Sequence, residues 1–288
     1  MTGVAEVADA ALECLVVPSF TRVGIAARRR LYHWPESEAD DLTGRVIAIS
    51  GVTSGLGLAA ATQLAARGAT VVAIGRDRDR TEGAVAGIRE GTGNSEVIAT
   101  IADLADLDAV RGAAAAIQRD HDRLDVLVHN AGVTRDRTIA KMPADRWDGL
   151  VDINLSSEER INDALLDGVL AENGRIVCVS SLSGIAGNAG QTNYATSKAG
   201  VIGMVEALEP VLRERGQTIN AVAPGFIETT MTAQMPLALR EAGRRMNSLR
   251  QGGLPVDVAE TVAFFASPAA AGVNGNVVRV CGQSLLGA

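Results

Sequence analysis

The sequence predicts an α/β fold: a Rossmann-type, doubly wound, seven-stranded parallel sheet in three layers, preceded by an N-terminal helical arm. Apolar runs that suit buried strands alternate with Ala-rich or periodic stretches long enough for helices, a pattern typical of a parallel sheet covered on both faces. A glycine-rich turn joins the first strand to the first helix, and residues 1–43 lack the alternation. The predicted strands are Val46–Ser50, Thr70–Ile74, Val97–Ile101, Leu124–Val128, Arg175–Val179, Thr218–Val222 and Val277–Val280.

Length and composition limit the classes of protein that need consideration. The 288 residues suffice for one α/β domain with a full core, so we divide the chain into an arm and linker (1–43) and a Rossmann domain (44–288). The formal net charge of −7 argues against a general nucleic-acid binder. The three cysteines are widely separated and form no CxxC pair, so we expect neither a disulfide framework nor a metal site. This use of cysteine fits the reducing cytoplasm. No run approaches the ~20 apolar residues of a membrane-spanning helix.

The N-terminal arm permits two interpretations. Apolar residues recur at helical spacing from Val4 to Leu15, and a second short helix is expected from Phe20 to Leu31, carrying Arg28–Arg30. The arm could pack on the enzyme's own surface or on a neighbouring subunit. Alternatively it could lie in a membrane interface with its arginines at the headgroups. Acidic residues on the first helix favour the packing interpretation.

The turn after the first strand has the composition of a phosphate-binding loop. Gly51 to Gly57 follow the GxxxGxG pattern and run directly into the helical stretch Leu58–Ala66. Glycines let the chain turn sharply and let a pyrophosphate approach the N–H groups of the helix N-terminus. No lysine follows Gly57, so a triphosphate loop of the Walker type is not indicated. The pattern therefore favours a dinucleotide over a plain structural turn.

The end of the second strand bears on the choice of dinucleotide. An acidic side chain at this place would accept the ribose 2′-hydroxyl of NAD, whereas an arginine suits a 2′-phosphate. Gly75 occupies the strand end and Arg76 comes next. The sequence therefore favours NADP(H), with NAD(H) possible. After the third strand, Asp103 and Leu104 could lie against the adenine, although Asp103 could equally cap the next helix.

Tyr194 and Lys198 form a YxxxK pair on a helix predicted from Asn193 to Arg215. One helical turn separates them, so their side chains share a face. A free tyrosine has a pKa of about 10, and a neighbouring ammonium favours the phenolate, which makes proton exchange easier near neutral pH. Ser180 and Ser181 end a strand upstream, and a hydroxyl there could bond a carbonyl oxygen of the substrate. This combination predicts acid/base chemistry at a carbonyl carbon rather than an ordinary half-buried tyrosine.

From Leu42 to Ala288 the chain resembles the short-chain dehydrogenase/reductases. The matching segments are Ser50–Gly57, His129–Gly132, Asn154, Ser181, Tyr194–Lys198 and Pro224–Gly225. The resemblance implies that Tyr194 is the general acid, that Lys198 binds the nicotinamide ribose and tunes Tyr194, that Ser181 orients the carbonyl, and that Asn154 anchors a water of the proton relay. The cofactor surface implied is Gly51, Thr53, Ser54, Gly55, Leu56, Gly57, Arg76, Asp103, Leu104, Asn130, Ala131, Gly132, Tyr194, Lys198, Pro224, Gly225, Ile227 and Thr229.

Three positions depart from the family pattern. Ser50 replaces the usual threonine and keeps the hydroxyl. His129 replaces the first asparagine of NNAG, and we assign it no chemistry. Ser54 stands where many NADP-specific members carry a basic residue, which leaves Arg76 to hold a 2′-phosphate largely alone.

The second half of the chain resembles one branch of the family, the 3-oxoacyl-thioester reductases of fatty-acid synthesis. The segments Val133–Asp136 and Gly187–Tyr194 carry the likeness, and the tail Val278–Ala288 resembles actinobacterial high-molecular-weight members. The branch implies that Gln191 serves the substrate and that Arg135 and Arg215 receive an acidic acyl carrier protein, unless both are simply solvated arginines. The first 130 residues look more like other actinobacterial short-chain reductases.

The predicted activity is thus reduction of a 3-oxoacyl thioester, on acyl carrier protein or CoA, to the 3-hydroxyacyl thioester. A dehydrogenase of a secondary alcohol, steroid or sugar would use the same residues. A cofactor-binding scaffold without turnover is the alternative outside enzymes. Family members are typically dimers or tetramers, so we expect a homo-oligomer.

Overall fold

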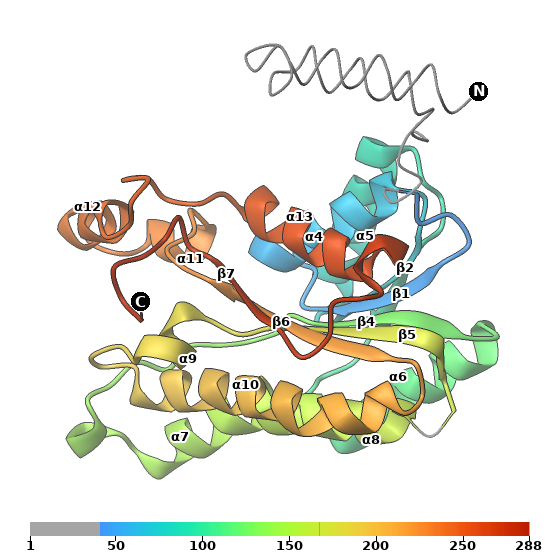
Figure 1. Ribbon diagram of the computed structural model, residues 1–288, viewed down its shortest axis with the longest axis horizontal. Helices are drawn as coiled ribbons and strands as arrows, with labels where there is room; N and C mark the ends of the chain where they lie inside the picture. Colours follow the sequence, from blue (N-terminus) through green and yellow to red (C-terminus); the bar gives the residue numbers. More distant parts are fainter. Residues whose placement is uncertain (1–40, 167, 288) are drawn as a thin grey trace, which may run out of the picture. The chain divides into compact units, whose positions relative to one another are not determined.

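The computed structural model describes residues 41–166 and 168–287 (Figure 1). The chain divides into two compact units, Met1–Asp40 and Asp41–Ala288. The expectations for the N-terminal arm, including its helices and its membrane contact, lie almost wholly outside the described residues. Leu42, at the start of the second unit, is fully buried in the core.

The described residues form one seven-stranded, all-parallel sheet, as the sequence predicts. The strand order is β3-β2-β1-β4-β5-β6-β7. The order runs outward in both directions from β1 and β4, which is the doubly wound arrangement. The strands are β1 (Val46–Ser50), β2 (Thr70–Gly75), β3 (Val97–Ile101), β4 (Leu124–His129), β5 (Leu170–Val179), β6 (Thr218–Pro224) and β7 (Val277–Val280).

Strand β5 begins five residues earlier than the sequence pattern predicts. Its pairing with β4 is irregular, because Leu124 pairs with Leu170 whereas Val126 pairs with Arg175. The extra residues bulge out through Asn173, whose φ is 60°. Glu172 and Asn173 in this part of β5 are polar and exposed, and they interrupt the apolar run, so hydrophobic periodicity could not identify this part as strand.

Two layers of helices cover the sheet (Figure 1). One core lies between the sheet and helices α4, α5 and α13, and includes Leu64, Ile88 and Phe265. The other lies under α6, α8 and α10, and includes Ile117, Ile161 and Val201. Alternation along β1 divides its residues between them, since Ile47 and Ile49 belong to the first core and Ala48 to the second. These helices span Gly55–Ala66 (α4), Arg78–Thr92 (α5), Leu107–Asp120 (α6), Ser157–Leu166 (α8), Thr192–Arg213 (α10) and Pro255–Ala266 (α13).

Shorter elements connect the layers. Before α8 the chain makes a π-helical turn, and beyond β6 short helices stand over the carboxyl ends of the strands. None of the described helices is long and apolar enough to cross a membrane. The shorter elements are η2 (Ile139–Lys141), α7 (Ala144–Val151), η3 (Asp152–Ser156), α9 (Leu182–Ala186), α11 (Thr230–Ala233), α12 (Leu237–Arg245) and η4 (Pro268–Ala270).

Candidate active site

The glycine loop between β1 and α4 leaves room for a ligand at a helix N-terminus. Gly51 and Gly55 have φ of 75° and 58°, which disfavour any side chain. A Cβ on Gly57 would lie 2.2 Å from the Gly51 carbonyl oxygen. Ser54, the N-cap residue of α4, makes no side-chain capping bond, and the first turn of the helix carries no acidic residue. Such a helix end suits the pyrophosphate of a dinucleotide.

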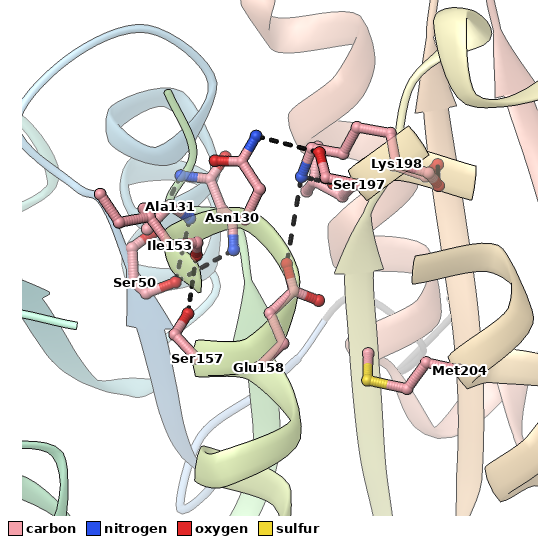
Figure 2. Close-up of polar contacts among 12 residues, drawn as sticks. Ser50, Asn130, Ala131, Ile153, Ser157, Glu158, Ser197, Lys198 and Met204 are labelled. Atoms are coloured by element: carbon pink, nitrogen blue, oxygen red, sulfur yellow. Dashed lines mark hydrogen bonds and ion pairs between the residues drawn. The ribbon is translucent and has the colours of Figure 1, made fainter. Parts of the chain in front are cut away.

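The ends of β1 and β4 are joined by polar contacts at the point where the strand order reverses. The Ser50 hydroxyl accepts hydrogen bonds from the backbone N–H groups of Asn130 and Ala131, at 3.1 and 3.0 Å. The Asn130 amide donates to the carbonyl oxygens of Ser50 and Gly51, at 2.8 and 3.2 Å. Figure 2 shows Ser50, Asn130 and Ala131 in this arrangement. The Ser50 hydroxyl therefore ties the end of β1 to the chain that follows β4 at this crevice.

A cleft of about 420 Å³ opens at this switch point, where ligands of doubly wound sheets bind. All of the residues that we expected to contact a dinucleotide line it, together with Ser180 and Ser181. Several further lining residues were not among those expected to contact a dinucleotide. These include Ile74, Asp77, Arg80, Ala102, Val133, Thr134, Ile153, Val179, Thr230 and Thr232.

At the end of the cleft formed by β2, two arginines are available to an anionic group. Arg76 and Arg80 both line the cleft and are exposed. Asp77 lies between them, but its carboxylate is used as the N-cap of α5, where it accepts from the Arg80 N–H at 2.9 Å. Arg80 lies in the first turn of α5. In the sequence, its position in the charged turn Arg76–Arg80 was the one sign that it could reach the cleft. Arg76 and Arg80 thus place two cations at this end of the cleft.

The alternative role of Asp103 as a helix cap is wrong. The N-cap of α6 is Asp106, whose carboxylate accepts from the N–H groups of Asp108 and Ala109. Asp103 closes a turn three residues earlier by accepting from the Ala105 N–H at 3.1 Å. It remains exposed on the cleft. The turn from Asp103 to Asp106 could not be placed from sequence because both residues suit an N-cap.

Tyr194, Lys198 and Ser181 meet in the same cleft. Lys198 is buried, and its ammonium donates to the Val179 carbonyl oxygen at 2.7 Å. Ser181 is the N-cap of α9, and its hydroxyl oxygen accepts from the Ser183 N–H at 3.1 Å. Its O–H therefore remains able to donate to a ligand. Helix α10 starts at Thr192 rather than Asn193 and ends at Arg213, and it places Tyr194 and Lys198 one turn apart as predicted.

Asn154 does not line the cleft. It is fully buried in η3, where its side chain accepts from the Val133 N–H at 2.8 Å and donates to the Val133 carbonyl at 3.0 Å. It also donates to the Ser197 hydroxyl at 3.3 Å. The amide therefore holds the chain after Gly132 against α10. Single π-helical turns of this kind are common at functional sites.

Below the cleft lies a group of buried ionisable side chains. His129 is fully buried on β4, and its Nε2 lies 2.8 Å from the Asn162 Oδ1. Burial lowers the pKa of His129 from its ordinary 6.5 to about 4, helped by the nearby Lys198 charge, so the ring is neutral. Burial also raises the pKa of the Cys178 thiol well above its usual value. Neither group reaches the cleft that holds Tyr194, so His129 remains without an assigned chemical role.

The residues expected at the substrate and carrier lie outside the cleft. Gln191 donates to the Asp136 carboxylate at 2.8 Å and accepts from the Asn188 amide at 2.8 Å, so it braces two loops. Arg135 is exposed, and its backbone carbonyl accepts from Asn193 at the start of α10. Arg215 is exposed just beyond the other end of that helix. Since α10 has 22 residues, roughly 30 Å separates the two arginines within one chain.

A doubly wound sheet with a glycine loop at its switch point and a Tyr/Lys pair on the same cleft defines a dinucleotide-dependent oxidoreductase. Comparison with known proteins agrees. A family model described as enoyl-(acyl carrier protein) reductase matches residues 51–282. The chain is 37% identical over 243 residues to the 3-oxoacyl-[acyl-carrier-protein] reductase FabG of Thermotoga maritima, which covers 84% of this chain and 98% of that one. It is also 37% identical over 244 residues to the FabG of Vibrio harveyi, with the same coverage.

Solved structures show the same likeness. The crystal structure of levodione reductase superposes with a TM-score of 0.79 at 30% identity and covers 84% of this chain and 97% of its own. That of gox2181 gives a TM-score of 0.81 at 31% identity and covers 85% and 97%. The chain therefore belongs to the short-chain dehydrogenase/reductase family and is an NAD(P)-dependent oxidoreductase.

Proposed function

We propose that this enzyme reduces a 3-oxoacyl thioester to the 3-hydroxyacyl thioester with NADPH, using Tyr194 as general acid. The observation that carries the proposal is that Tyr194, Lys198 and Ser181 share one cleft with the glycine loop. The substrate class is supported by the names of the relatives, which are 3-oxoacyl-[acyl-carrier-protein] reductases of similar length. The glycine loop and the uncapped N-terminus of α4 fit a dinucleotide.

In this mechanism the protein residues position the ketone and supply a proton. The Ser181 O–H donates to the carbonyl oxygen, and the Tyr194 O–H passes its proton to the same oxygen. A nicotinamide held in this cleft would supply the hydride to the carbonyl carbon, and with the proton from Tyr194 this would give the secondary alcohol. Loss of that proton leaves a phenolate on Tyr194, which the Lys198 ammonium stabilises by its charge until solvent restores the proton.

Other residues keep this arrangement in place. The Ser180 hydroxyl donates to the Lys198 carbonyl oxygen at 2.7 Å and so fixes the first part of α10 against the end of β5. The bond from Lys198 to the Val179 carbonyl holds the ammonium at the end of β5, where both residues line the cleft. Asn154 holds Val133 and Ser197, which places the chain after Gly132 beside α10.

We further propose that Arg76 and Arg80 select NADPH by binding the 2′-phosphate. For the thioester carrier, Arg135 and Arg215 supply positive charge at the two ends of α10. Because one chain holds them far apart, they cannot form a single small patch within it, and we propose that they make separate contacts with an acidic carrier.

The test is a steady-state assay with NADPH or NADH and acetoacetyl-CoA or longer 3-oxoacyl-CoA substrates. A panel of cyclic ketones and secondary alcohols is run in parallel, because one structural relative is a levodione reductase. We expect the highest kcat/KM with NADPH and a 3-oxoacyl thioester. Tyr194→Phe should lower kcat by 10²-fold or more while NADPH binding persists. A preference for cyclic ketones would replace the substrate proposal, and an active Tyr194→Phe variant would contradict the proposed acid.

A further inference from the structure

Glu158 is a buried carboxylate beside the Tyr194–Lys198 pair for which the mechanism above has no use. It lies in the first turn of α8, and only 3% of its surface is exposed. Its Oε1 is 4.0 Å from the Lys198 ammonium. Neither carboxylate oxygen has a hydrogen-bond partner among the residues that the structure describes. A buried carboxyl group without a hydrogen bond is costly to the fold, so its presence calls for an explanation.

The packing of η3 on α10 brings the carboxylate to the lysine. Gly200 lies on α10, and a Cβ there would stand 2.5 Å from the Leu155 side chain of η3. The glycine thus permits a close approach of the two elements. Figure 2 shows the Glu158 side chain extended toward the Lys198 ammonium, with a line joining the two.

The surroundings make Glu158 the acidic group that acts on Lys198. From β4, His129 faces this region as a neutral ring, and from β5, Cys178 faces it as a neutral thiol. Glu159 on the same helix is exposed to solvent. Burial raises the pKa of Glu158 from its ordinary 4.5 to about 8, although the Lys198 charge opposes the rise. The carboxyl group therefore changes its charge in the range where an enzyme of this kind would work.

We propose that Glu158 is a positioning residue that holds Lys198 and sets how strongly its positive charge favours the Tyr194 phenolate. When Glu158 is protonated, the ammonium acts on Tyr194 alone. When Glu158 is ionised, its negative charge offsets part of the ammonium's field, and the phenol keeps its proton to higher pH. The inference rests on the proposed roles of Tyr194 and Lys198.

The sequence offers a direct way to measure this effect without turnover. The chain has two tyrosines, Tyr32 and Tyr194, so Tyr32→Phe leaves Tyr194 as the sole source of phenolate absorbance. In that background the ultraviolet phenolate signal is titrated against pH in the cofactor-free protein. We expect Glu158→Gln to move the midpoint about one unit toward lower pH. Glu159→Gln is the matched control: the exposed Glu159 also acts on Glu158 by its charge, but solvent screens it, so this variant should move the midpoint much less than Glu158→Gln does.

The titration is paired with a rate profile. In the parent enzyme, the plot of log kcat against pH should change slope near the Glu158 pKa of about 8. Glu158→Gln should lose this change of slope, whereas Glu158→Asp should keep one. Equal phenolate midpoints in the parent and Glu158→Gln proteins would overturn the proposal. If Glu158→Gln does not fold, Glu158→Asp decides, because a carboxylate drawn back from Lys198 should shift the midpoint in the same direction by less. Inactivity of all variants with the midpoint shift intact would count against the proposed function and leave this inference standing.

Discussion

The Ser180 hydroxyl donates a 2.7 Å hydrogen bond to the backbone carbonyl of Lys198. Both groups are buried, and the bond joins the end of β5 to α10 within the turn that carries Tyr194 and Lys198. The lysine is thus fixed twice, through its carbonyl by Ser180 and through its ammonium by Val179. The position of the pair depends on the sheet rather than on the helix alone.

Ser180→Ala removes one of these attachments. We expect the free energy of unfolding to fall by about 1–3 kcal/mol, because the buried carbonyl of Lys198 loses that donor, and kcat to fall several-fold because α10 is less firmly placed. Denaturant unfolding and steady-state kinetics measure the two effects. Ser181→Ala is the comparison, since its hydroxyl lines the cleft and also caps α9: we expect a larger fall in kcat than for Ser180→Ala, with a loss of stability of about 1 kcal/mol from the missing cap. Unchanged stability of Ser180→Ala would contradict the anchoring role.

Lys198→Met keeps most of the side-chain volume and removes the ammonium. We expect weaker NADPH binding and a kcat lower by about 10²-fold, because the same charge would serve the ribose and the phenol. Fluorescence titration gives the Kd for NADPH, and single-turnover kinetics give the rate. A variant that loses rate but binds NADPH normally would show that the ribose contact is misassigned.

Arg76→Ala tests the choice of cofactor. The KM for NADPH should rise about tenfold while that for NADH changes little, because a charge-assisted bond to the 2′-phosphate is lost. Arg80→Ala should do the same to a smaller degree. Arg78 is the matched control in the same turn, since it pairs with Glu82 at 3.1 Å and does not line the cleft. Equal losses for NADPH and NADH would indicate a general structural effect.

The buried ionisable groups give stability a definite pH dependence. Glu158 has a pKa of about 8 in the folded chain against an ordinary 4.5, so its contribution is complete below pH 4.5 and is lost as the pH rises toward 8. His129 has a pKa of about 4 against 6.5, so its contribution is present above pH 6.5 and is lost as the pH falls toward 4. The two oppose each other between 4.5 and 6.5, and Glu158 acts alone from 6.5 to 8.

In that upper window, Glu158 should lower the free energy of unfolding by about 1.4 kcal/mol per pH unit. Denaturant unfolding at a series of pH values should show this slope reduced in Glu158→Gln and unchanged in Glu159→Gln. The same slope in all three proteins would mean that Glu158 is not held protonated in the fold.

Arg135→Glu tests the carrier proposal. We expect kcat/KM for a protein-borne 3-oxoacyl substrate to fall about tenfold at low salt, with a smaller loss as salt screens the charge. Acyl-CoA substrates should lose less. Arg215→Glu is measured separately because it lies beyond the opposite end of α10. Unchanged activity toward the protein-borne substrate in both variants would mean that the carrier docks elsewhere.

The fold and the cleft were predictable because their signals are local. The positive φ values of Gly51 and Gly55 and the close approach of backbone to Gly57 both require glycine. The glycine pattern in the sequence therefore marks this loop directly. Alternation of apolar runs was enough to place all seven strands. The early part of β5 was missed because Glu172 and Asn173 interrupt its apolar run. The helix cap at Asp106 was confused with Asp103 because the two differ only in turn geometry.

The contacts of Asn154 and Glu158 could not have been read from sequence. Both depend on how η3 packs against α10, which is a tertiary contact made possible by Gly200. A glutamate in the first turn of a helix is ordinarily a solvated residue that favours the helix dipole. Only the fold shows that this one is turned inward, toward Lys198.

The bonds among Ser50, Asn130 and Ala131 carry a consequence for cofactor recognition. They tie the two central strands together using protein atoms alone, so the floor of the crevice has its shape before any nucleotide arrives. Association should therefore involve little ordering of the backbone in this region, and hydrogen exchange at Asn130 and Ala131 should be slow in the free enzyme. The selectivity of the crevice is then a property of a rigid template, tuned by the exposed arginines at its rim.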